Sequence, residues 1–375
     1  MQDLIKNKTG ISDALNICLQ QKVHFVAYRL PGEYHASLII QKEPSVRVIG
    51  KLNQKLPQKG FLIAPFSRET EEAWLVKPDI LLREPFDDDQ LERLDSIRGN
   101  SLSHSENSYP RETEKSEYIR LIRDSVNKIK SGEFDKVVLS RVKSVSGNFR
   151  SRLPQLFIEL CKAYPHAFVY LFNINGQCWT GATPEPFICS IKGEIRTVSL
   201  AGTRPYNEDD LDISRWNNKE LQEQEYVTLH IEKILDGFHI NTFRKNGPYV
   251  TKAGNLLHLR TDFTFSADSV GNRLPALIAA LHPTPAVCGM STGEAMDFIR
   301  NSEKHSRGYY AGFLGPVGIS EHFSLYVNLR CMRVYDDRLI LYIGGGITME
   351  SVPEDEWEET EIKADTLLSV LKQVR

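Results

Sequence analysis

Strand-like segments follow one another in runs along this chain, with few helical segments between them. Patterns rich in β-branched and aromatic residues occupy VHFVAYRL, ASLIIQK and GFLIAPF near the start, and GYYAGFLGPVGI and FSLYVNLRCMRVYDDRLILYIGGGI near the end. A parallel sheet would need a crossover, usually a helix, between successive strands. The runs therefore predict an α+β fold whose core is large, mostly antiparallel and sandwich-like, with helices on its flanks.

Segments with a helical period of apolar residues stand between these runs. KSEYIRLIRDSVNKIKSGEF places Tyr118, Ile122 and Val126 on one face, and Gly132 is expected to end that helix. The same reasoning predicts helices in LPQLFIELCKAYP, NNKELQEQEYVTLHIEKILDGF, RLPALIAALHP, GEAMDFIRNSEKH and DEWEETEIKADTLLSVLKQV. Turns are expected at Gly181, at Lys192–Gly193 and at Gly202.

Composition narrows the class of protein. The 375 residues carry a formal net charge of −3, which argues against nucleic-acid binding through phosphate neutralisation. The six cysteines form no CxxC pair, and we find neither a signal peptide nor a membrane-length apolar run, so a cytoplasmic protein is expected.

Residues 1–110 are interpreted as a variable portion packing on the same core as the domain 111–375. The polar stretch 96–116 is predicted to be an exposed connection.

Lysine stands directly before an apolar run in FDKVVLSR. Lys136 either marks the solvated start of a strand, because lysines are seldom buried, or points into a pocket as a base. A desolvated lysine, or one near another cation, lowers its pKa readily and becomes usable as a base near neutrality. The segment alone leaves both readings open.

Two helical segments each carry acidic residues three positions apart. Glu220 and Glu223 share one helix face, and Glu356 and Glu359 share another, with Lys363 one turn later. Magnesium prefers oxygen ligands, so two such pairs from different helices suit Mg²⁺. Charged helix faces are more often simply solvated.

Other segments combine rigidity or exposed backbone with a single polar group. Glu185 lies between two prolines in GATPEPF, which hold it in an extended or turn geometry. It is either a carboxyl fixed in position for catalysis or part of an ordinary surface turn. LAGTRP and YIGGGIT end strands with glycines whose N–H groups suit an anion, or simply form tight turns. Alternation along LYVNLRCMRV puts Tyr326, Asn328 and Arg330 on one face, where the arginine either binds a carboxylate or faces solvent.

Taken in order, nine stretches across about 115–373 resemble the chorismate-utilising enzymes, which include isochorismate, salicylate, anthranilate and aminodeoxychorismate synthases. The first hundred residues add little to the resemblance. The matching stretches are KVVLSR, GATPEPF, SLAGTRP, KELQEQEYV, HPTPAVCGMSTGEA, RGYYAGFLGPVG, LYVNLRCMRV, GGGI and SVPEDEWEETEIK.

The resemblance implies a chorismate-binding-enzyme fold, chorismate as substrate, Mg²⁺ as cofactor and a monomer or weak dimer without nucleic-acid or membrane partners. It also implies roles for particular residues. Lys136 falls at the position of the base that activates water, and Glu185 at the general-acid position. Glu223 and Glu359 match metal ligands, with Glu220 and Glu356 nearby. The substrate-binding positions are Gly202, Thr203, His258, Tyr310, Arg330, Gly344, Gly346 and Lys363.

Among family members, the resemblance favours isochorismate synthase, an isomerase of the menaquinone or siderophore branch. Anthranilate synthases typically carry glutamine where Lys136 stands, and Leu200–Ala201 replaces the lysine of aminodeoxychorismate synthases. Salicylate synthase, which would add pyruvate elimination, and a non-catalytic chorismate-binding relative remain the alternatives. In the implied mechanism a neutral lysine and a neutral glutamic acid work in one pocket, which requires opposite pKa displacements.

Overall fold

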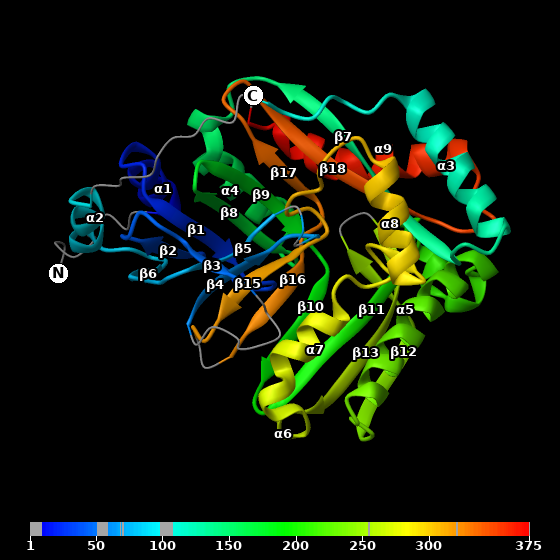
Figure 1. Ribbon diagram of the computed structural model, residues 1–375. Helices are drawn as coiled ribbons and strands as arrows, with labels where there is room; N and C mark the ends of the chain where they lie inside the picture. Colours follow the sequence, from blue (N-terminus) through cyan, green and yellow to red (C-terminus); the bar gives the residue numbers. More distant parts are fainter. Residues whose placement is uncertain are drawn as a thin grey trace.

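The computed structural model describes residues 10–50, 59–67, 69, 71–97, 108–253, 256–319 and 322–374, so residues 98–107 of the connection predicted at 96–116 lie outside the described residues. Two nine-stranded sheets dominate the molecule, with helices around them (Figure 1). Every strand pair in the described ranges is antiparallel. The α+β prediction with antiparallel sheets is confirmed. Its domain boundary at 110 stays a prediction.

Both sheets combine strands from distant parts of the chain. In spatial order the first sheet consists of β14 (Gly289–Met290), β7 (Lys136–Ser146), β18 (Arg338–Ile347), β17 (Cys331–Val334), β9 (Gln177–Thr183), β8 (Phe168–Ile174), β1 (His24–Arg29), β2 (Ser37–Gln41) and β6 (Ile80–Arg83). The second consists of β12 (Phe243–Ala253), β13 (Leu256–Ser266), β11 (Glu194–Pro205), β10 (Pro186–Ile191), β16 (Ser324–Val327), β15 (Phe313–Val317), β4 (Gly60–Ala64), β5 (Ala73–Val76) and β3 (Arg47–Ile49).

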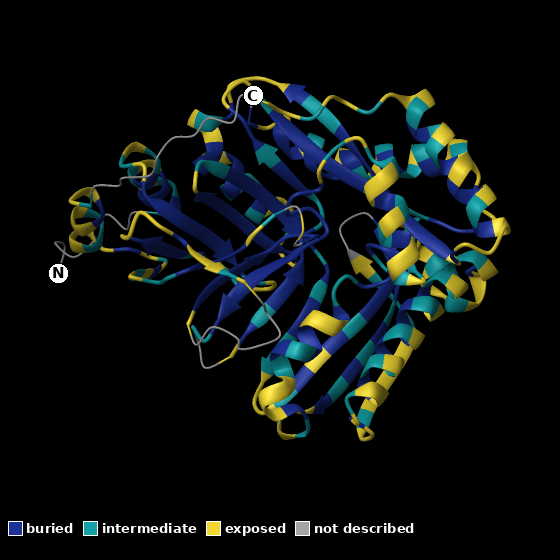
Figure 2. Cartoon of the chain, in the orientation of Figure 1, coloured by how far each residue is buried: buried dark blue, intermediate teal, exposed yellow. Residues whose placement is uncertain are grey.

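Some helices pack into the core that the two sheets share, and others cover the second core on the opposite face of the first sheet. They are α1 (Ile11–Gln20), α2 (Asp88–Asp95), α3 (Lys115–Lys130), α4 (Leu153–Ala163), α5 (Asn218–Gly237), α6 (Ala267–Val270), α7 (Leu274–Leu281), α8 (Thr292–Ser302) and α9 (Pro353–Leu371). Short 3₁₀ turns occupy Arg150–Arg152, Glu208–Leu211, Ile213–Arg215 and Gly271–Arg273. The outward faces of the helices are exposed, whereas most strand residues are buried (Figure 2).

Side-chain alternation in β8 explains how one sheet serves two cores. Phe168 and Tyr170 point into the core between the sheets, whereas Val169 and Leu171 point into a second core beneath α1, α4 and α9. Phe168 also stacks on Tyr326 of the other sheet, with ring centroids 4.2 Å apart and planes at 4°. Because both faces of β8 are covered, its sequence is apolar throughout.

Two of the places where the chain crosses between the sheets lie next to each other. Residues 184–185 carry it from β9 to β10, and residues 328–330 carry it back from β16 to β17. The two crossings are hydrogen-bonded to each other: Val327 N donates to the Glu185 carbonyl oxygen at 3.0 Å, and Ala182 N donates to that of Arg330 at 3.1 Å. Each crossing therefore fixes the position of the other.

Three expectations from the sequence are wrong at these places. LYVNLRCMRV is not one alternating strand, because Asn328 to Arg330 form the crossing, and Arg330 adopts a left-handed φ of 48°. Gly181 lies inside β9 rather than in a turn, where a Cβ would come within 2.7 Å of the Arg330 carbonyl oxygen. Gly202 lies inside β11 at a register shift, with φ of 70°. The turn expected at Lys192–Gly193 is confirmed.

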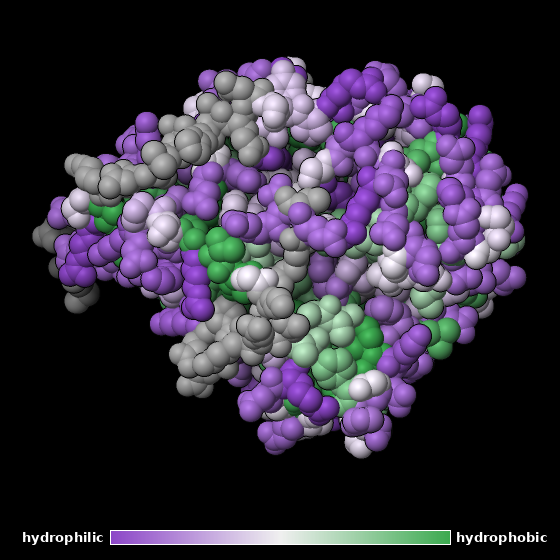
Figure 3. All heavy atoms as spheres, viewed as in Figure 1, coloured by the Kyte–Doolittle hydropathy of each residue, from purple (hydrophilic) through white to green (hydrophobic). Residues whose placement is uncertain are grey.

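The face of the molecule in Figure 3 is mostly hydrophilic, with an apolar area over α7. Across the described residues, no helix combines the length and the apolar character needed to cross a membrane.

Replacing Gly181 by alanine tests the close approach of the crossings. The added methyl group would meet backbone and Cβ atoms of residues 330–331 at 2.7–3.0 Å, so we expect the free energy of unfolding to fall by about 1–3 kcal/mol. Gly293→Ala in α8 is the matched control, because no atom lies within 4 Å of its Cβ position and helices favour alanine. Urea unfolding measures both changes, and an equal, near-zero effect would contradict this packing.

Candidate active site

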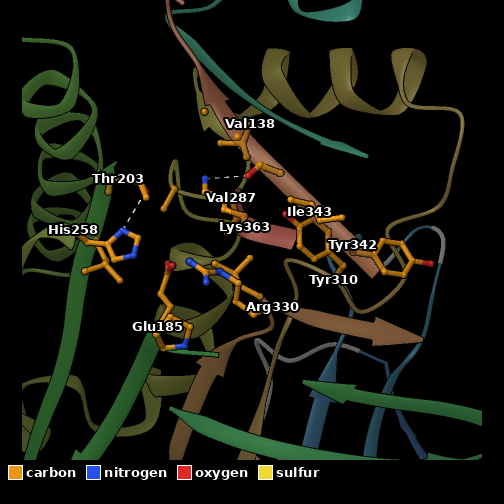
Figure 4. Close-up of a pocket in the computed structure, with 18 of the residues that line it drawn as sticks. Val138, Glu185, Thr203, His258, Val287, Tyr310, Arg330, Tyr342, Ile343 and Lys363 are labelled. Atoms are coloured by element: carbon orange, nitrogen blue, oxygen red, sulfur yellow. Dashed lines mark hydrogen bonds between the residues drawn. The ribbon is translucent and has the colours of Figure 1, made fainter. Parts of the chain in front are cut away.

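A cavity of about 90 Å³ lies where the crossings meet the glycine-rich end of β18 and the strands β11 and β13. We call it the chamber. Side chains from both sheets and from α5 and α9 converge on it (Figure 4). Its polar or glycine lining consists of Glu185, Gly202, Thr203, Glu223, His258, Tyr310, Arg330, Gly344, Gly345, Gly346 and Lys363. Except for Lys136 and the glutamates at 220, 356 and 359, every candidate site residue lines this one cavity.

Lys136 is the first residue of β7, and its side chain is fully buried. Its Nζ donates a hydrogen bond to Oε1 of Glu223 at 3.0 Å, and Glu223 lines the chamber. The solvated-strand-start reading of this lysine is therefore wrong. A buried ammonium needs a partner of opposite charge, and Glu223 on α5 provides it.

Glu185 lies on the first crossing and is 8% exposed. Burial raises the pKa of its carboxyl group to about 8, although the charges of Lys136, Arg330 and Lys363 oppose that rise. The group is therefore mainly protonated at neutral pH and can donate a proton. Figure 4 shows its carboxyl beside the Arg330 guanidinium. The surface-turn reading is wrong.

Arg330 lies on the second crossing, next to Glu185. Within the described part of the chain, its guanidinium forms no ion pair or hydrogen bond with another side chain, although it borders the chamber. Tyr310, which is 4% exposed, lies on the other side of the same space. An unpaired, partly enclosed guanidinium is a suitable seat for a carboxylate, because the two groups can form parallel hydrogen bonds.

Two glycines of β18 make room for functional side chains. A Cβ on Gly344 would lie 2.5 Å from the Tyr310 hydroxyl, and one on Gly346 would lie 2.5 Å from Oε1 of Glu223. Both glycines are therefore required by space rather than by a turn. The wall that they form is bare backbone, which lets a ligand approach the strand closely.

His258 on β13 faces the same space. Its Nδ1 lies 3.1 Å from the Gly202 carbonyl oxygen and 3.2 Å from the Thr203 hydroxyl. Burial, with the charges of Arg330 and Lys363, lowers its pKa to about 3, so the ring is neutral. Because Nδ1 donates to a carbonyl, Nε2 is left as an acceptor, and it is buried without a partner among the described residues.

The four candidate metal ligands are each paired with a cation. The pairs are Arg204–Glu220 at 3.0 Å, Lys136–Glu223 at 3.0 Å, Lys219–Glu356 at 2.6 Å and Lys363–Glu359 at 2.7 Å. In the described ranges, no three acidic, histidine or cysteine side chains are grouped closely enough to hold a metal ion. In this structure, each of the four carboxylates is therefore engaged in an ion pair.

The same carboxylates nevertheless have the chemistry that a hard divalent cation needs. Glu356 is 1% exposed, and its Oε2 has no hydrogen-bond partner among the described residues. Burial and the neighbouring Glu359 raise the pKa of Glu356. An orphaned, buried oxygen next to a second carboxylate fits Mg²⁺, provided that the cationic side chains move away.

Sequence reasoning did not identify the cationic partners Arg204 and Lys219, nor the apolar wall of the chamber. Helical spacing could have suggested Lys219, which precedes the acidic pair on α5. Arg204 appears within SLAGTRP, but nothing in the sequence indicates its reach to Glu220. The apolar wall consists of Val138, Pro184, Leu200, Ala201, Ala286, Val287, Leu329, Tyr342, Ile343, Ala364 and Leu367.

The raised pKa of Glu185 predicts a pH-dependent stability. Between pH 4.5 and about 8 the carboxyl group ionises in the unfolded chain but stays protonated in the folded one, so it lowers stability as pH rises. Glu185→Gln mimics the neutral form, and we expect its stability relative to the native protein to increase from pH 5 to pH 8. Urea unfolding at both pH values measures the difference, and a constant difference would rule out the raised pKa.

Comparisons with known proteins agree with this fold. A sequence profile described as "Chorismate binding enzyme" matches residues 78–372. The vibriobactin-specific isochorismate synthase of Vibrio cholerae is 29% identical over 260 residues, which are 68% of this chain and 66% of that protein. The salicylate biosynthesis isochorismate synthase of Pseudomonas aeruginosa is 30% identical over 262 residues, 68% of this chain and 54% of that protein. The chain thus spans between about half and two thirds of the length of these relatives.

A solved structure is also similar. MenF, the menaquinone-specific isochorismate synthase from Escherichia coli, aligns with a TM-score of 0.76 and 20% identity, covering 98% of this chain and 92% of that one. At this identity the match supports the fold. Because the family profile covers more than half of the residues, the chain belongs to the family of chorismate-binding enzymes.

Proposed function

We propose that the protein is an isochorismate synthase, an isomerase that converts chorismate to isochorismate reversibly. The observation that carries the proposal is two buried groups of opposite kind: Glu185, a protonated carboxyl that lines the chamber, and Lys136, whose Nζ contacts Glu223 in the chamber wall. Curated relatives that carry this enzyme name support it. A base and an acid held by different elements suit a reaction that adds water at one carbon and removes hydroxide at another.

Chorismate carries two carboxylates, and the chamber offers separate partners for them. The unpaired Arg330 guanidinium, with the Tyr310 hydroxyl across the same space, would bind the enolpyruvyl carboxylate. The bare backbone at Gly344 and Gly346 leaves room for the flat ring. Gly202, Thr203, His258 and Lys363 would surround the remaining polar groups.

In the proposed reaction Lys136, as the free amine, accepts a proton from the water that attacks C2. Glu185 donates its proton to the departing hydroxyl at C4, which leaves as water while the ring double bonds shift. One water enters and one leaves, so atoms and charge balance. Lys136 must release Glu223 before it can act, which makes the 3.0 Å contact a resting arrangement.

Mg²⁺ is the proposed cofactor, and Glu220, Glu223, Glu356 and Glu359 are the residues that would hold it. When bound, the ion would neutralise the ring carboxylate and orient the ring. The protein's own part is to offer four carboxylates, of which Glu356 already has one unpartnered oxygen.

The product assay tests the function. Incubation with chorismate and Mg²⁺ is expected to yield isochorismate, and Lys136→Ala and Glu185→Gln are each expected to lower kcat by about 10²–10⁴-fold. Lys143→Ala is the matched control on the same strand, because Lys143 pairs with Glu361 outside the chamber. Chromatography with fluorescence detection measures the products. Salicylate with free pyruvate would establish the salicylate synthase alternative, and unconsumed chorismate would establish a binding protein.

Removing divalent cations should stop turnover without unfolding the protein. In excess EDTA we expect isochorismate formation to fall below detection and to return when Mg²⁺ is added. We expect the melting temperature to stay the same, because each carboxylate already has a cationic side-chain partner. Turnover that persists in EDTA would disprove the cofactor assignment, and a large loss of melting temperature would disprove the role of the ion pairs.

A further inference from the structure

A second cavity, of about 440 Å³, adjoins the chamber. We call it the vestibule. It shares Pro184, Leu200, Arg330 and Leu367 with the chamber, so the two cavities touch at the Arg330 side chain. The rest of its wall comes from the end of α4 and the start of β8, from β12 and β13, and from α9. These residues are Ala163, Tyr164, Pro165, His166, Ala167, Ala182, Thr251, Lys252, Arg260 and Thr366.

The vestibule wall is positively charged. Arg330, which it shares with the chamber, lines it together with Lys252 and Arg260. Among the described residues that line it, none is an aspartate or a glutamate. Arg260 is held by Asp262 at 2.7 Å, but Lys252 has no carboxylate within ion-pairing distance in the described ranges, and its Nζ lies 3.5 Å from the Tyr206 ring centroid. Two cations, Lys252 and Arg330, are therefore left uncompensated along one path.

The two cavities also differ in volume. At about 90 Å³ the chamber is smaller than the roughly 300–1,000 Å³ of typical ligand sites, whereas the vestibule lies within that range. Glu223, which lines the chamber, is also held by Lys136 in the resting protein. A small dicarboxylate can therefore enter the vestibule of the resting protein but needs a rearrangement to enter the chamber.

We propose that the vestibule is a preformed capture site for small dicarboxylate anions, from which the substrate passes Arg330 into the chamber. The identity of that substrate as chorismate rests on the proposed function. Cavities lined by one sign of charge concentrate oppositely charged ligands and raise association rates, and salt screens this effect. The vestibule therefore acts on substrate capture rather than on the chemical step.

Lys252→Ala tests capture directly, with Lys245→Ala as the matched control. Both lysines lie on β12 and both variants remove one positive charge, but Lys245 pairs with Glu232 away from the vestibule. At low salt we expect Lys252→Ala to lower kcat/KM for chorismate about fivefold, with the loss in KM. The difference from the native protein should vanish at roughly 0.5 M KCl, where the screening length is only a few ångströms. An effect no larger than that of Lys245→Ala would overturn the proposal while leaving the function intact.

A binding measurement keeps the test independent of turnover. Benzene-1,3-dicarboxylate is an unreactive dianion, and calorimetric titration at low salt gives its affinity for the native protein and for both variants. We expect Lys252→Ala to weaken binding about fivefold and Lys245→Ala to leave it unchanged. No binding to the native protein, or equal binding to all three, would overturn the vestibule even if chorismate were not a substrate.

Discussion

The pairing of the two crossings is the interaction on which the site depends. A sandwich of antiparallel sheets offers few places where backbone leaves one layer for the other, and here two such places lie side by side. Thr183 Oγ1 donates to the Val327 carbonyl oxygen at 2.6 Å, which joins the crossings a third time. Their contacts leave Gly181 no space for a side chain and hold Arg330 in a left-handed conformation. An acid and a guanidinium that are far apart in sequence become neighbours for this reason.

Burial then sets the protonation states of the groups around the chamber. The charged form of Glu185 loses more solvation than the nearby cations return, so its carboxyl keeps the proton. The same desolvation keeps His258 neutral, with Nε2 as an acceptor. Glu223 on α5 behaves differently: burial works against its ionisation, but the ammonium groups of Lys136, Lys363 and Lys219 outweigh it and lower its pKa. One small region thus contains both protonated and ionised carboxyl groups.

Much of this could be predicted from the sequence, for identifiable reasons. Runs of strand residues predict antiparallel sheets because they leave no room for crossover helices, and β8 shows why a strand buried on both faces lacks alternation. The assignment of Lys136 to a pocket needed the family resemblance, since an isolated lysine before a strand is ambiguous. The crossing at Asn328–Arg330 could not be predicted, because a change of sheet leaves strand propensity almost unchanged. Pairings such as Arg204–Glu220 depend on tertiary geometry that spacing does not encode.

The triple glycine of β18 has a consequence for how selectivity can change. Where a ring would lie, that wall consists of peptide planes, whose shape follows the twist of the sheet and has no rotamers to adjust. Mutation can therefore reshape the cavity only through the side chains around that wall, at aliphatic positions such as Val138, Leu200 and Val287. Divergence of this scaffold toward new ring substituents should accumulate there, while the glycine strand stays as an invariant template.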